Sequence, residues 1–142
     1  MGKHSELMDE WFRRVWNEND TAFIHEACDI DMTTKGHRGR PLLGPDDFLD
    51  FHGIISALVD NIHIKVLRCI EEGDWASVLY EFSSTKKGCD TPVVFTGSSM
   101  LRIQNGKIAE VYEHVDFIEF FKRTGALPDN TLEHCLGGKS IS

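Results

Sequence analysis

The sequence predicts an α+β fold, in which helices near the N-terminus pack on one face of an antiparallel sheet. Three observations support this prediction. Apolar residues recur at helical spacing up to about residue 59, they alternate with polar residues from Ile62 onward, and Asn105-Gly106 joins two strand-like runs. Helices that come first and strands that follow are typical of proteins in which the two kinds of element are segregated.

Three helices are predicted before the strands. Residues 5–17 carry an apolar stripe at three- and four-residue spacing, with two tryptophans. Trp11 and Trp16 are predicted to lie in the core, and the alternative is that they line the roof of a cavity, since large rigid aromatic side chains do both. A second short helix reaches about Cys28, and a third begins at Pro45, where the missing N–H is no loss. His52 falls on the apolar face of the third helix, as a core residue or as a pocket residue.

The segment between the second and third helices is predicted to be mostly loop. Residues 31–34 fit a short strand, whereas residues 35–44 contain glycine and proline and show no periodicity. Loops on a rigid scaffold often carry binding groups, so His37 and Arg38 could reach a ligand. A solvated loop is the simpler interpretation.

Four strands and a closing helix follow. Short connections between strands at residues 62–70 and 75–86 and the two runs within Val93–Asp116 predict an antiparallel meander. Residues 117–123 fit a short helix that ends at a glycine. We expect one domain over residues 1–125 and a loosely attached, polar tail over residues 126–142.

The last hairpin contains the candidate site. Asn-Gly favours a type I′ turn, because both central residues need positive φ. With Asn105 and Gly106 as the turn, Ile103 faces Ile108, and alternate side chains share one face. That face holds Phe95, Gly97, Ser99, Leu101, Glu110, Tyr112, His114 and Asp116. Titratable groups beside small residues are typical of a pocket wall. A solvated sheet face is the alternative, and a β-bulge would exchange the two faces beyond it.

These residue types suit acid/base chemistry on a carbonyl compound. Asp116 and His114 could act as general acid and base, Tyr112 could stabilise an oxyanion, and Glu110 lies beside them. Proton abstraction next to a carbonyl would lead to aldol closure, isomerisation or dehydration. No nucleophile motif, nucleotide-binding motif or compact set of metal ligands is present, so we expect no metal and no cofactor.

Charge and hydropathy limit the partners. The formal net charge of -8 disfavours nucleic acid and anionic membrane surfaces. The chain shows neither an apolar signal-peptide core nor a run of membrane-spanning length, so we expect a cytoplasmic protein with free cysteine thiols. The other face of the last hairpin, with Met100, Val111 and Val115, is rather apolar. We expect a homodimer that covers this outer face.

Five segments together resemble the SnoaL-like polyketide cyclases of the nuclear-transport-factor-2-like superfamily. They are RVWNEND, GPDDF, EEGDWASVLYEF, RIQNGKIAEVYEHVD and FIEFFKRTG, and the resemblance covers roughly residues 7–125. It implies a cone-shaped fold, in which a strongly curved antiparallel sheet encloses a pocket that the N-terminal helices close. Members include cyclases that perform an intramolecular aldol reaction without metal or cofactor.

The resemblance also implies roles for single residues. In the cyclases an aspartate at the end of the last strand is the acid/base, and Asp116 matches that position. Arg102 stands where the cyclases have a pocket histidine, and it could stabilise an enolate but cannot accept a proton at neutral pH. We therefore expect a cofactor-independent acid/base enzyme that acts on a small, apolar carbonyl compound. The alternative is a non-catalytic small-molecule binding protein of the same fold.

Overall fold

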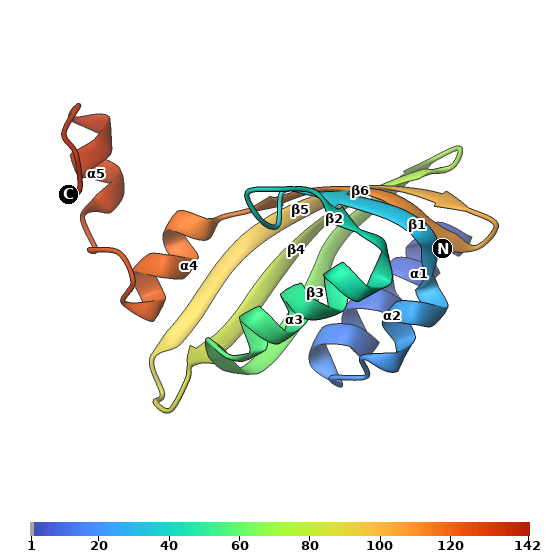
Figure 1. Cartoon of the computed structure of the whole chain (residues 1–142), viewed down its shortest axis with the longest axis horizontal. Helices are drawn as coiled ribbons and strands as arrows, with labels where there is room; N and C mark the ends of the chain where they lie inside the picture. The colour runs from blue at the N-terminus through green and yellow to red at the C-terminus, as the bar shows by residue number, and fades with distance from the viewer. Residues whose placement is uncertain (1) are drawn as a thin grey trace.

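The structure, a computed structural model, describes residues 2–142. It is a mixed α+β fold, as predicted, with helices packed on a curved, unclosed sheet (Figure 1). The helical elements are α1 (Lys3–Trp11), η1 (Phe12–Asn17), α2 (Ala22–Ala27), α3 (Gly44–Ser56), α4 (Phe117–Thr124) and α5 (Thr131–Leu136). The strands are β1 (Cys28–Lys35), β2 (Leu42–Leu43), β3 (Val59–Glu72), β4 (Trp75–Lys86), β5 (Pro92–Gln104) and β6 (Lys107–Val115).

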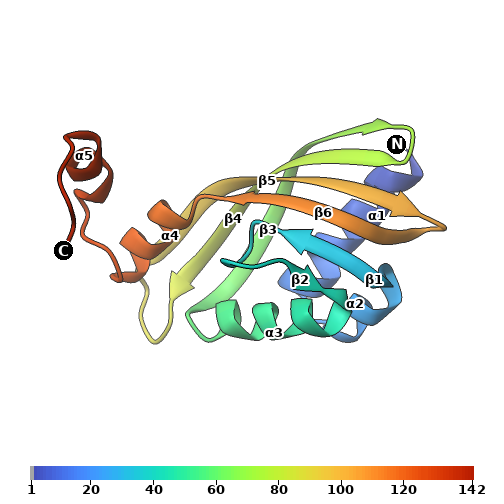
Figure 2. The ribbon, with the colours of Figure 1, turned by 45° about the horizontal axis from the view of Figure 1, so that its top comes forward.

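The sheet has the strand order β2-β1-β6-β5-β4-β3. Strands β3 to β6 form the predicted antiparallel meander, while β1 adds to β6 in parallel. Helices α1, η1, α2 and α3 lie on one side of the curved sheet (Figure 2). This arrangement places the core between these helices and the concave face of the sheet.

The first predicted helix changes its winding halfway along. It begins as the α-helix α1 and continues as the π-helix η1, where the backbone N–H of Glu18 donates to the carbonyl of Arg13 at 2.9 Å. Phe12 and Trp16 of η1 are buried against the core. Stretches of π-helix are rare and often occur at functional sites. Here η1 brings large aromatic side chains over the concave face of the sheet.

The last hairpin begins as predicted and then departs from the predicted register. Asn105 and Gly106 form the turn with φ of 53° and 74°, and Ile103 pairs with Ile108. The next pair joins Arg102 to Glu110, so Ala109 is an extra residue that forms a β-bulge.

The bulge makes the predicted pairings beyond it wrong. Ser99 pairs with Glu113 rather than with Tyr112, and Gly97 pairs with Val115 rather than with His114. Because one extra residue exchanges the two faces of a strand, the faces predicted for β6 are reversed from residue 110 onward. The concave face receives Val111, Glu113 and Val115, and the outer face receives Glu110, Tyr112 and His114.

Helix α4 closes one end of the sheet. It ends at Gly125, which has φ of 87°, the left-handed conformation expected of a C-terminal glycine. Phe120 is buried against Phe82 and Phe95. The predicted tail contains α5, which lies beyond α4 and away from the sheet in both views (Figures 1 and 2). None of the helices within residues 2–142 is long and apolar enough to cross a membrane.

Candidate functional site

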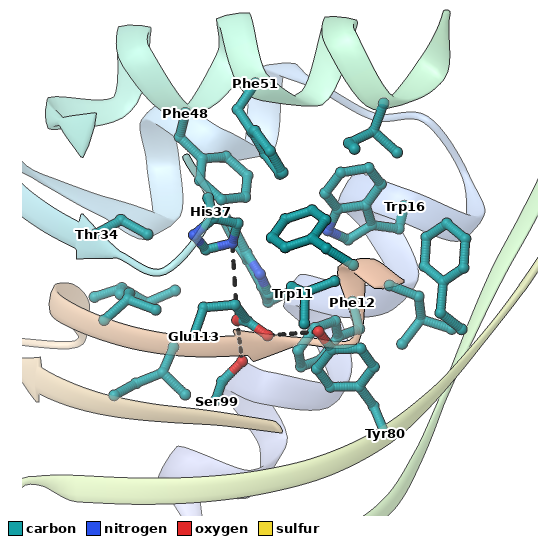
Figure 3. Close-up of a pocket in the computed structure, with 18 of the residues that line it drawn as sticks. Trp11, Phe12, Trp16, Thr34, His37, Phe48, Phe51, Tyr80, Ser99 and Glu113 are labelled. Atoms are coloured by element: carbon teal, nitrogen blue, oxygen red, sulfur yellow. Dashed lines mark hydrogen bonds and ion pairs between the residues drawn. The ribbon is translucent and has the colours of Figure 1, made fainter. Parts of the chain in front are cut away.

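A cavity lies between the concave face of the sheet and the helices that cover it (Figure 3). The empty space between the lining atoms is about 700 Å³, counting the part open to solvent. Its walls are mostly apolar, and ten of the 21 lining residues are Trp, Phe or Tyr: Trp11, Phe12, Trp16, Phe48, Phe51, Tyr80, Phe82, Phe95, Phe117 and Phe120. Such walls suit a ligand with a large apolar surface.

Glu113 places a carboxyl group inside this apolar cavity. The Tyr80 hydroxyl donates to Glu113 Oε2 at 2.5 Å, and the Ser99 hydroxyl donates to Oε1. Burial disfavours the charged form and raises the pKa of Glu113 to about 7, although both hydrogen bonds act in the opposite direction. Burial and the adjacent carboxylate also raise the pKa of Tyr80, so its hydroxyl stays protonated. Near neutral pH the carboxyl is therefore able to take up or release a proton.

His37 lies next to this carboxyl. Its Nε2 is 3.8 Å from Glu113 Oε1, and its ring meets Phe48 and Phe51 edge-on at centroid distances of 5.5 and 4.7 Å. Burial lowers the pKa of His37 to about 4, so the imidazole is neutral at neutral pH. Figure 3 shows His37 between the two phenylalanines of α3 and Glu113 of β6. The solvated loop preferred from the sequence is therefore wrong for His37.

Gly36 explains how His37 enters the cavity. It follows β1 with φ of 101°, and a Cβ at this position would lie 1.9 Å from the backbone oxygen of Glu113. Only glycine adopts this conformation readily and permits such a close approach. The lack of a side chain at Gly36 therefore allows the segment after β1 to lie directly against the backbone of β6.

Three of the predicted site residues line the cavity: Trp16, Phe95 and Ser99. Glu110, Tyr112 and Arg102 lie instead on the outer face, where Arg102 Nε donates to Glu110 Oε2 at 2.8 Å and the Tyr112 hydroxyl donates to Oε1. The predicted pocket positions of Glu110, Tyr112 and Arg102 are therefore wrong. For Glu110 and Tyr112 the cause is the bulge. Arg102 alternates with Leu101 and Ile103, so the predicted register had already placed it on the other face of the hairpin.

His114, Asp116 and His52 also lie outside the cavity lining. His114 is exposed on the outer face, and Asp116 caps α4 by accepting the backbone N–H of Glu119 at 3.1 Å. His52 Nε2 is 3.0 Å from the carbonyl of Val15, and this histidine is a buried core residue that joins α3 to η1. The acid/base roles of Asp116 and His114 stay predictions, made for positions that the structure places away from the cavity.

Glu113, Tyr80 and Thr34 were not predicted as cavity residues, and His37 was predicted to reach a ligand only as the alternative to a solvated loop. One signal for Glu113 was available: it alternates with Val111 and Val115, so a single acidic residue interrupts an apolar strand face. For His37 the only signal was its place in a loop, because its burial depends on contacts distant in sequence.

Comparison with known proteins identifies the family. The family model described as SnoaL-like polyketide cyclase matches residues 6–123. The chain belongs to this family. The match covers most of the chain and confirms the resemblance found in the sequence. No curated protein matches the chain.

Solved structures share the fold of this SnoaL-like protein at low sequence identity. A putative SnoaL-like polyketide cyclase from Jannaschia sp. CCS1 is 14% identical, with a TM-score of 0.78 over 89% of this chain and 94% of that chain. IdmH, a putative polyketide cyclase from Streptomyces antibioticus, is 17% identical, with a TM-score of 0.75 over 85% and 97% of the two chains. A Catenulispora acidiphila protein with a ketosteroid isomerase-like fold is 18% identical, with a TM-score of 0.74 over 84% and 92%.

Proposed function

We propose that this SnoaL-like protein is a cofactor-independent acid/base enzyme that acts on a small, largely apolar carbonyl compound. The observation that carries the proposal is a buried carboxyl, Glu113, whose two oxygens accept hydrogen bonds from Tyr80 and Ser99 inside an aromatic cavity. A pKa of about 7 suits a group that must both accept and return a proton at neutral pH. The family membership and the fold of the neighbours support a small-molecule site in this cavity.

The proposed chemistry starts with the ionised form of Glu113. The carboxylate takes a proton from the carbon next to the ligand carbonyl, and the electron pair of that C–H bond moves onto the carbonyl oxygen to form an enolate. In an aldol closure the enolate carbon attacks a second carbonyl, and the alkoxide that forms takes the proton back from Glu113. In an isomerisation Glu113 returns the proton to a different carbon of a conjugated enolate. Low polarity around the site strengthens each electrostatic contact with the developing charge.

Proton exchange tests this chemistry without knowledge of the natural substrate. In D2O the protein should replace the protons next to the carbonyl of 1-tetralone with deuterium, which NMR follows as loss of the proton signal. Because the base must be ionised, the rate should rise with pH through a midpoint near 7. Glu113→Gln keeps the size of the side chain but removes the base, and it should slow the exchange by at least about 100-fold.

A matched control separates the base from a general effect of charge. Glu110 is three residues away on the same strand and faces outward, so Glu110→Gln should leave the exchange rate within about two-fold. Equal exchange by the wild type and Glu113→Gln would reject Glu113 as the base. If 1-tetralone bound without exchange in either protein, the non-catalytic binding protein would be the better description.

We also propose a homodimer formed through the outer face of the sheet. The apolar residues of this face differ in part from the sequence prediction, because Val111 and Val115 line the cavity. Ile70, Leu79 and Met100 remain on the outer face with exposures of 62%, 45% and 51%. Several exposed apolar side chains on one sheet face are typical of a contact surface.

Native mass spectrometry tests the dimer directly. The wild type should appear at twice the chain mass of 16.1 kDa. The double variant Leu79→Lys/Met100→Lys should shift the protein to monomer at micromolar concentration, because the two lysines would be buried unpaired in the interface. Ile30→Lys is the control. Ile30 is 81% exposed on β1, so this variant should remain a dimer like the wild type. A monomeric wild type would contradict the proposal.

A further inference from the structure

Two buried polar atoms of the cavity lack a hydrogen-bond partner within residues 2–142. They are Thr34 Oγ1 and His37 Nδ1. Thr34 is fully buried and His37 is 8% exposed, and both line the cavity (Figure 3). Buried polar atoms are nearly always paired, because an unpaired one loses its hydration without compensation. These two atoms therefore indicate where a ligand or an ordered water makes polar contacts.

The other polar groups around the carboxyl are already engaged. The hydroxyls of Tyr80 and Ser99 both donate to Glu113. His37 Nε2 is 3.8 Å from Glu113 Oε1, beyond hydrogen-bond distance, and the negative charge of an ionised carboxylate at this distance favours the tautomer that carries its proton on Nε2. In this tautomer His37 Nδ1 is a bare acceptor, and it needs a donor from the ligand. The Thr34 hydroxyl can donate to an oxygen or accept from a donor.

We propose that Thr34 and His37 bind a ligand hydroxyl group at this end of the cavity, and that His37 selects it over an ether or ketone oxygen. The hydroxyl hydrogen binds His37 Nδ1, and Thr34 Oγ1 donates to a ligand oxygen. An ether or ketone oxygen at this place lacks the hydrogen and leaves His37 Nδ1 unpaired. The aromatic walls accommodate the apolar ring that carries the hydroxyl. This inference rests on the proposed function, because it concerns the ligand of the same site.

Calorimetric titration with two aromatic probes tests the inference. The probes are 2-naphthol, which donates and accepts, and 2-methoxynaphthalene, which only accepts. The wild type should bind 2-naphthol about ten-fold more tightly than 2-methoxynaphthalene, because the methoxy probe leaves one buried group, His37 Nδ1, unpaired. His37→Phe should weaken 2-naphthol binding by about five- to ten-fold and reduce the preference towards one. Thr34→Val should weaken both probes to a similar extent, because Thr34 donates to an oxygen that both of them carry. Thr33→Val, one residue away on β1, should retain the preference and the affinities, since Thr33 does not line the cavity.

A nitrogen NMR readout distinguishes a hydrogen bond from a loss of shape. Binding of 2-naphthol should shift the His37 Nδ1 resonance in the wild type and in Thr33→Val, while 2-methoxynaphthalene should not. Equal affinity of the wild type for the two probes would overturn the inference, as would failure to bind either probe or full retention of the preference in His37→Phe. The proposed function has a separate test. If the probes show no preference, Glu113→Gln can still slow proton exchange, and if Glu113→Gln leaves exchange unchanged, the preference for 2-naphthol can still be observed.

Discussion

Replacing Gly36 with alanine should destabilise the protein by about 3–5 kcal/mol, in the range of the most damaging single substitutions. The added Cβ would lie 1.9 Å from the Glu113 carbonyl oxygen, a distance that no relaxation of a flexible side chain can relieve. The φ of 101° adds strain, since alanine adopts such a conformation only at a cost of about 1–3 kcal/mol. The segment after β1 must therefore move away from β6.

Urea unfolding measures this loss as a lower midpoint with an unchanged dependence on denaturant. Gly39→Ala is the matched control in the same loop, because a Cβ there would have no atom within 4 Å. It should change the free energy of unfolding by less than about 0.5 kcal/mol. Since the displaced segment carries His37, Gly36→Ala should also weaken 2-naphthol binding. Stability near that of the wild type would show that the segment after β1 does not need glycine at this position.

Removing Glu113 or His37 should give opposite slopes of stability with pH. The folded-state pKa of Glu113 is raised from 4.5 to about 7, so its contribution to stability is present below pH 4.5 and is lost as the pH rises towards 7. The folded-state pKa of His37 is lowered from 6.5 to about 4, so its contribution is present above pH 6.5 and is lost as the pH falls towards 4.

The two effects oppose each other in the wild type between about pH 4.5 and 6.5. The folded site then holds one proton, on Glu113, and the unfolded chain also holds one, on His37. With equal proton numbers in the two states, this pair adds no slope to the free energy of unfolding. In the wild type the pair therefore leaves the pH dependence of the free energy of unfolding unchanged, and the effect of each residue can be measured only when the other is removed.

Relative to the wild type, the stability of Glu113→Gln should rise with pH over this window, and that of His37→Asn should fall. Each slope approaches about 1.4 kcal/mol per pH unit, the value for one proton. Urea unfolding at pH 4.5, 5.5 and 6.5 measures the slopes, and differences from the wild type remove the titrations that all the proteins share. Glu110→Gln should run parallel to the wild type above pH 5, because its pKa is lowered in the folded state. Parallel curves for all four proteins would contradict the burial of the pair.

The sequence alone predicted most of the fold, because local chemistry decides it. The spacing of apolar residues located the helices and the meander, and Asn105-Gly106 located the last turn, since few other residues accept positive φ at both positions. Three of the predicted residues line the cavity: Phe95 and Ser99 lie on β5, the strand without the bulge, and Trp16 lies on the apolar face of the first predicted helix.

Tertiary structure decided which carboxyl enters the cavity. Ala109 is a small residue in a strand, and nothing in its neighbours marks it as the extra residue of a bulge. The bulge places Val111, Glu113 and Val115 on the concave face, where two valines are removed from water and Glu110 stays outside. The burial of His37 likewise depends on the contact between Gly36 and Glu113, which are far apart in the chain. The position of the bulge and the burial of His37 depend on packing over the whole sheet, so no short stretch of sequence determines them.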